Sequence, residues 1–106
     1  MLNTLKFAAA ALAISLVAAP AVAQTVDLQF VNRSGQNVVA LQTSASSNPS
    51  WEDDLFQGRV LRPGQTFSLR INRLQDCFYD VRALLANGVW STGTFDICST
   101  TTINIR

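Results

Sequence analysis

The chain has 106 residues, with eight basic and seven acidic side chains, two cysteines and no histidine. That length is enough for one small domain. A net charge of +1 lacks the basic surplus that binding to nucleic acid or to an anionic membrane surface requires, so we expect neither as a partner.

The composition also limits catalysis. Without histidine, no side chain titrates near neutral pH in its ordinary state, and a serine or cysteine triad lacks its base. The single lysine, Lys6, lies in the leader described next, so a mature chain has no amine for Schiff-base chemistry. We therefore expect no catalytic residue, no cofactor and no zinc. The chemistry left open is a carboxylate pair acting on a glycosidic bond, or a carboxylate-bound calcium ion.

Residues 1–23 have the pattern of a secretory signal peptide. Lys6 precedes an apolar run from Phe7 to Ala19, and a small-residue cleavage pattern ends at Ala23. The alternative is a membrane anchor kept as a helix, but the run is short for a bilayer. We expect a single mature domain at 24–106 that is periplasmic or secreted and does not bind the membrane.

Alternating apolar side chains predict half-buried strands along the mature chain. They lie at Thr25–Val31, Asn37–Thr43, Thr66–Asn72 and Thr100–Arg106, with a short strand over 59–61. The turn residues from Asn32 to Gly35 predict that the second strand pairs back on the first. Pro63-Gly64 has the spacing of a type II turn.

The segment Ser50–Gly58 has a helix start and a helix stop within a few residues. Ser50 is a good N-cap, acidic residues follow it, and Gly58 can end the helix. We expect one short helical turn here, with Trp51 and Leu55 on one face toward the core.

Asn87-Gly88 lies midway between Cys77 and Cys98, and Asn-Gly is a strong signal for a two-residue type I′ hairpin. In that register the two cysteines form a non-hydrogen-bonded pair, whose Cα separation suits a disulfide. The same register pairs Trp90 with Leu85.

These segments give about seven short strands with no helical pattern of useful length between them. We expect an all-β fold, a small antiparallel β-sandwich with one short helical turn and one disulfide.

Three groups of side chains are candidates for a site. Glu52, Asp53 and Asp54, with Asp76 or Asp80, could hold calcium, although acids in the first turn of a helix also stabilise that helix. Trp51 and Trp90 could stack on a sugar or anchor a protein, although each also has an explanation in the core. Arg59, Arg62, Arg70 and Arg73 could recognise carboxylates or phosphates, or simply balance nearby acids.

The expected hairpin also predicts two structural contacts. Asp80 and Arg82 share one strand face, where an ion pair would be structural. Tyr79 lies opposite Asp96, which predicts a cross-strand hydrogen bond.

Several motifs together resemble a known family: Phe30-Val31-Asn32-Arg33-Ser34-Gly35, Trp51-Glu52-Asp53-Asp54-Leu55, Cys77-Phe78-Tyr79-Asp80-Val81-Arg82 and Phe95-Asp96-Ile97-Cys98. The family comprises small exported β proteins of proteobacteria, most without an assigned function. Some members carry the label argininosuccinate lyase, which does not suit this chain because that enzyme is far larger and mainly helical. The resemblance implies export, one domain and a disulfide, and it transfers no catalytic residue.

We therefore expect a non-enzymatic binding module of the cell envelope whose partner is a protein or an envelope component. Trp51, Asp53, Asp54, Arg59 and Arg62 are its candidate contact residues, because Ser44–Gly58 is the longest segment without a strand. The alternatives are a calcium-dependent glycan binder or carboxylate-based glycosidase that uses Asp53 and Asp54, and an inhibitor of a periplasmic hydrolase.

Overall fold

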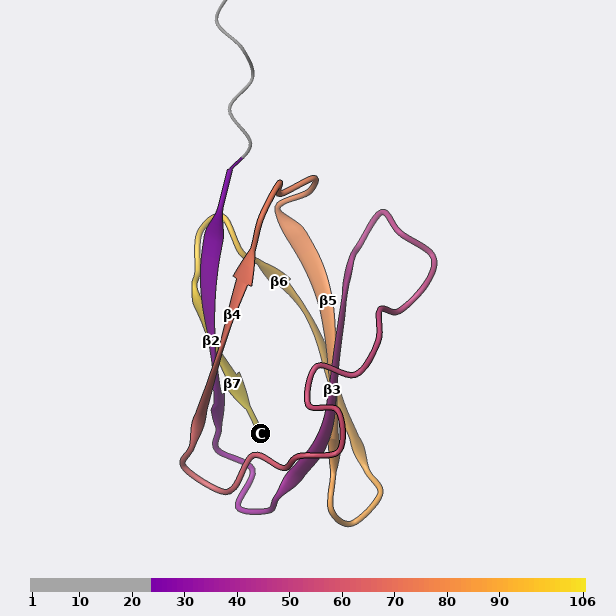
Figure 1. Cartoon of the computed structure of the whole chain (residues 1–106), viewed down its shortest axis with the longest axis vertical. Helices are drawn as coiled ribbons and strands as arrows, with labels where there is room; N and C mark the ends of the chain where they lie inside the picture. The colour runs from indigo at the N-terminus through magenta and orange to yellow at the C-terminus, as the bar shows by residue number, and fades with distance from the viewer. Residues whose placement is uncertain (1–23) are drawn as a thin grey trace, which may run out of the picture.

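The computed structural model describes residues 24–106, which form two three-stranded sheets (Figure 1). The strands are β2 (Val26–Asn32), β3 (Val38–Ala45), β4 (Thr66–Ile71), β5 (Phe78–Leu85), β6 (Trp90–Asp96) and β7 (Thr102–Ile105). One sheet has the order β4-β2-β7 and the other has the order β3-β5-β6. The predicted signal peptide, 1–23, lies outside the described residues. Within 24–106 no helix is long and apolar enough to span a membrane.

Alternation along the strands gives each sheet one buried face. On β2, Leu28 and Phe30 are fully buried, whereas Asp27, the residue before Leu28, is exposed. The buried side chains of both sheets belong to one hydrophobic cluster, which includes Leu28, Phe30, Ile103 and Ile105 from the first sheet and Leu41, Val81, Ala83 and Leu85 from the second. The two sheets therefore share a single core.

The predicted pairing of the first two strands is wrong. β2 lies between β4, to which it is antiparallel, and β7, to which it is parallel, whereas β3 pairs with β5. The side-chain amide of Asn32 at the end of β2 donates to the carbonyls of Gln36, at 2.6 Å, and Leu61, at 2.9 Å. These bonds fix a turn that carries the chain into the other sheet instead of back along β2.

Residues 24–106 form six strands instead of about seven. Residues 59–61 contribute one isolated bridge, between Leu61 and Val38, and no strand. An antiparallel fold was predicted, but the β2–β7 pair is parallel, so the fold contains both kinds of pairing. The predicted turn at Pro63-Gly64 is confirmed, with the positive φ of +83° at Gly64 that a type II turn requires.

The helical turn predicted at Ser50–Gly58 does not form. The segment instead follows the edge of β3, where the Glu52 N–H donates to the Thr43 carbonyl at 3.1 Å and the Leu55 N–H to the Leu41 carbonyl at 2.8 Å. So short a helix is marginal by itself, because its few internal bonds must offset the cost of nucleation. Bonds to an existing strand satisfy the same backbone groups and cover that strand's edge.

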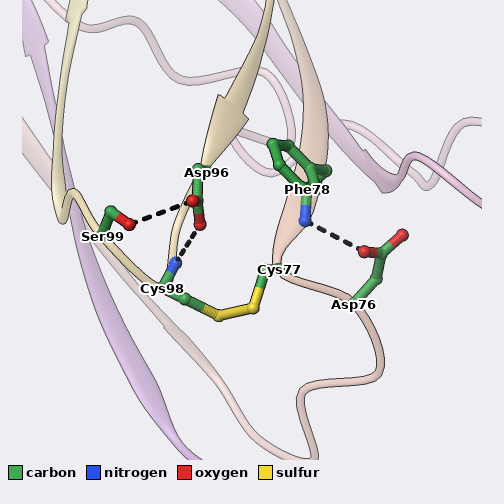
Figure 2. Close-up of a disulfide and its surroundings, with 6 residues drawn as sticks. All are labelled: Asp76, Cys77, Phe78, Asp96, Cys98 and Ser99. Carbon is green, nitrogen blue, oxygen red and sulfur yellow. Dashed lines mark hydrogen bonds between the residues drawn. A yellow bond between two sulfur atoms is a disulfide. The ribbon is translucent and has the colours of Figure 1, made fainter.

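The predicted disulfide is confirmed, but the hairpin register is not. Cys77 and Cys98 are bonded, with their Cα atoms 5.2 Å apart (Figure 2). Trp90, however, lies opposite Leu84 and not Leu85, so every pair along β5 and β6 is shifted by one residue.

The loop explains the shift. A type I′ turn needs a positive φ at both Asn87 and Gly88, and of these only Gly88 has one, at +88°. The Leu85 N–H donates to the Val89 carbonyl at 2.9 Å, so the loop has three residues, 86–88. A glycine in the left-handed conformation ends such loops.

The cysteines still meet because the chain turns after the last bond of the ladder. That bond joins the Ile97 N–H to the Cys77 carbonyl at 2.8 Å. The Asp96 carboxylate then accepts from the Cys98 N–H, at 3.1 Å, and from the Ser99 hydroxyl, at 3.0 Å (Figure 2). This turn directs Cys98 back toward Cys77.

The three-residue loop predicts unequal costs at its last two positions. Gly88→Ala should lower the free energy of unfolding by about 1–2 kcal/mol, because alanine is strained at positive φ. Asn87→Ala should cost less, and Gly88→Asn should recover part of the loss because asparagine tolerates this conformation. Urea unfolding of the three variants measures this. Equal losses for Gly88→Ala and Asn87→Ala would instead favour the two-residue loop.

Candidate functional site

The outer face of the β3-β5-β6 sheet carries two indole rings stacked on one guanidinium. The guanidinium carbon of Arg82 lies 4.5 Å from the ring centroid of Trp51 and 4.7 Å from that of Trp90. Both distances are within the range of cation–π attraction. Trp51 is 36% exposed and Trp90 is 43% exposed. We call Trp51, Arg82 and Trp90, with the neighbouring Gln42, the tryptophan–arginine face.

Strand register positions the arginine. Arg82 on β5 lies between Gln42 on β3 and Thr92 on β6. Its Nε donates to Gln42 Oε1 at 2.8 Å, and Gln42 Nε2 donates to the Glu52 carbonyl at 3.0 Å. Within residues 24–106 its terminal nitrogens donate no hydrogen bond. The guanidinium is therefore oriented by the protein and keeps donors for a ligand.

Trp51 belongs to this surface. The predicted helix would have placed it in the core, and that prediction is wrong. The buried side chain of its segment is Phe56, which is 3% exposed and meets the ring of Phe67 edge-on at a centroid distance of 5.1 Å. Trp51 is held near the sheet by its neighbours: the Ser44 hydroxyl donates to the Ser50 carbonyl at 2.7 Å. Trp51 is thus exposed because the segment follows the edge of β3 and does not form the predicted helix.

The sequence did not identify Arg82 or Gln42 as site residues. It assigned Arg82 an ion pair with Asp80, and this is wrong. Asp80 Oδ1 instead accepts from the hydroxyls of Ser46, at 2.9 Å, and Thr94, at 2.8 Å. The signal that would have found Arg82 is the correct hairpin register, which puts it on the same face as Trp90.

Asp54 is a structural residue. Its Oδ1 accepts from the backbone N–H of Leu41 on β3, at 2.9 Å, and from that of Phe56, at 3.0 Å. The adjacent Asp53 is exposed. One carboxylate thus joins the loop to the strand that it covers.

The acidic residues do not gather into a calcium site. In the described part of the chain, the one group of three candidate ligand atoms within 4.8 Å of each other belongs to Cys77, Asp96 and Cys98. The two sulfurs are bonded to each other, so neither is a thiolate that can bind a metal.

The four arginines around the Pro-Gly turn have different surroundings. Arg70 on β4 forms a bidentate pair with Asp27 on β2, with Nε–Oδ1 at 2.7 Å and Nη2–Oδ2 at 3.2 Å. The hydrogen bond from Arg70 holds the pKa of Asp27 below its usual value. Arg59 and Arg62 are exposed, on either side of the bridge that Leu61 makes.

A hollow of about 350 Å³ lies between β3 and β4, and its lining includes Glu52, Arg73 and Tyr79. Tyr79 lies opposite Phe95, so the predicted hydrogen bond to an opposing Asp96 is wrong. Burial raises the pKa of Tyr79, and the negative charge of Glu52 raises it further. At neutral pH this phenol is a hydrogen-bond donor and not a base.

Comparison of the chain with models of protein families, with curated proteins and with solved structures finds no match. The resemblance to small exported proteobacterial proteins therefore stays a prediction from sequence.

Asp54 and Asp53 form a matched pair for testing how the loop is held. Asp54→Ala should lower the free energy of unfolding by about 1–3 kcal/mol, because two partly buried N–H groups lose their acceptor. Asp53→Ala should change it by less than about 0.5 kcal/mol, as is usual for an exposed side chain. Thermal and urea unfolding of both variants checks this, and equal effects would contradict the assignment.

The chain has one tyrosine, so tyrosinate absorbance reports Tyr79 alone. Its titration midpoint should lie above 10 in the folded protein and near 10 in urea, because folding raises the pKa. The unfolded state then loses the proton first. The contribution of Tyr79 to stability should be constant below about pH 10 and should be lost as the pH rises through the folded pKa, a loss that Tyr79→Phe should remove. Identical midpoints in the folded and unfolded protein would contradict the burial argument.

Proposed function

We propose that this protein is an exported, non-enzymatic binding module of the cell envelope, and that its partner docks on the tryptophan–arginine face. The observation that carries the proposal is the stack itself. Two large half-exposed indoles flank a guanidinium that is held by one bond and has donors to spare. Tryptophan and arginine are the residues most enriched where binding energy concentrates.

The chemistry of the face indicates what it fits. The indoles offer flat apolar surface, and the free edge of the Arg82 guanidinium suits a carboxylate or another paired acceptor. Arg82 has no acidic partner within residues 24–106. A partner that sets an acceptor beside a flat or aliphatic group therefore satisfies both features at once.

The absence of enzymatic activity is inferred from the composition. Residues 24–106 contain no histidine and no lysine, and both cysteines are in the disulfide. Asp54 and Asp80 are engaged in hydrogen bonds that serve the fold. These observations favour recognition over acid–base or nucleophilic chemistry.

Export is inferred from the leader pattern at 1–23 together with the disulfide, which is typical of oxidising compartments. We further infer that the two sheets pack as a β-sandwich, because their buried side chains share one cluster. The disulfide and this small core would together hold the binding face rigid outside the cytoplasm.

The test is affinity capture with the protein expressed from residue 1 in a host cell, its processed N-terminus determined by mass spectrometry. Immobilised protein is incubated with envelope extract, and the double variant Trp51→Ala, Trp90→Ala is run beside it. We expect one specific partner whose capture falls at least about 30-fold in the variant, as for truncation of binding hot spots.

Val60→Ala is the matched control, because Val60 is 44% exposed but lies outside the face. Its capture should equal that of the wild type. If the double variant keeps its partner, or if only its thermal stability changes, the stack merely fastens the loop and the proposed function fails. Capture that requires calcium would also contradict it.

A further inference from the structure

We propose that strand β6 pairs with β6 of a second copy of this chain, in antiparallel orientation about a two-fold axis near Gly93. The two β3-β5-β6 sheets then become one continuous sheet. The proposal does not depend on what binds the tryptophan–arginine face.

The backbone of β6 has a row of unpaired groups along its outer side. Two bonds bracket its ladder with β5, from the Leu85 N–H to the Val89 carbonyl and from the Ile97 N–H to the Cys77 carbonyl. Since bonded pairs recur every second residue, the odd positions of β6 face β5 and the even positions face away. In the described residues no backbone N–H of Trp90, Thr92 or Thr94 has a backbone partner.

Within residues 24–106 the other sheet edges are protected, and the edge of β6 is not. The segment around Glu52 and Leu55 covers β3. β4 carries a charged side chain, Arg70, which pairs with Asp27 on β2, and β7 has only four residues. Charge and short length both disfavour pairing of an edge strand with another chain. β6 has seven residues, no proline and no charge before Asp96. Native proteins rarely leave such an edge open.

The edge is complementary to itself. Only even positions can bond to even positions, so an axis near Gly93 sets Thr92 opposite Thr94 of the second copy. Trp90 then lies opposite Asp96 of the second copy, whose carbonyl already accepts from the N–H groups of Ser99 and Thr100, so the threonine positions supply the new bonds. Threonine pairs are favourable across strands, and no like charges face each other. A strand from a protein with charges at these positions would fit less well.

A hollow beside the same edge supports this occupant. It has a volume of about 180 Å³, and its lining includes Phe95, Ile103 and Ile105. The Phe95 ring lies over Gly93, where an added Cβ would come within 2.9 Å of it. The inner face of the second copy's β6 would present Phe95 beside this opening and so shield apolar surface from water.

The experiment is sedimentation equilibrium of the processed, oxidised protein, expressed from residue 1, at concentrations up to about 1 mM. A reversible dimer is expected. Thr92→Pro should weaken it at least tenfold, since it removes an outward N–H and leaves the ladder to β5 intact. Thr92→Val keeps the N–H and should keep the dimer. Near-ultraviolet circular dichroism establishes that each variant is folded.

Hydrogen exchange gives a test that needs no substitution. As the protein concentration rises, the amides of Thr92 and Thr94 should become more protected, whereas those of Gly93 and Phe95, which bond to β5, should not change. A monomer at every concentration, or equal association of the two Thr92 variants, would overturn the proposal. So would concentration-independent exchange, even if another protein were found to pair with β6.

Discussion

The topology depends on one buried amide, that of Asn32, which is 1% exposed at the end of β2. Its nitrogen donates to the carbonyls of Gln36 and Leu61, and its oxygen accepts from the Ser34 N–H. Leaving such groups unpaired would cost about 1–3 kcal/mol each, so the turn is strongly specified. Because this turn sends β3 to the other sheet, both sides of β2 are free for β4 and β7. The disulfide joins the residue just before β5 to a residue just after β6.

Strand positions could be predicted from the sequence because they depend on local alternation. Thr66–Asn72 was expected and β4 spans Thr66–Ile71, with the same residues facing inward. The pairing of the strands could not be predicted, because it depends on contacts between residues far apart in the sequence. Nothing near Asn32 in the sequence reveals that its amide will meet Leu61. The helix at Ser50–Gly58 failed for the same reason, since its backbone donors found acceptors on β3.

Prediction of the candidate site required the β5–β6 register to be correct to within one residue. In a strand pair, a shift of one position moves a side chain to the opposite face of the sheet. The two-residue loop would have put Trp90 level with Leu85, which faces the core, whereas the three-residue loop puts it level with Leu84. Trp90 thereby shares the outer face with Arg82. An Asn-Gly pair suits both loops, so the sequence correctly predicted a hairpin and a disulfide but not the face on which the tryptophan lies.

One loop has two roles that connect the fold to its surface. The segment around Glu52 and Leu55 completes the edge of β3, and the same segment presents Trp51 to Arg82. Its attachment combines backbone bonds with a cation–π contact worth about 0.5–2 kcal/mol, so the partner binding that we propose would be coupled to protection of this edge. A ligand that stacks on Trp51 would therefore also stabilise the cover of β3. At the other edge of the same sheet, no segment of residues 24–106 covers β6, and that asymmetry would direct the association we propose to one edge only.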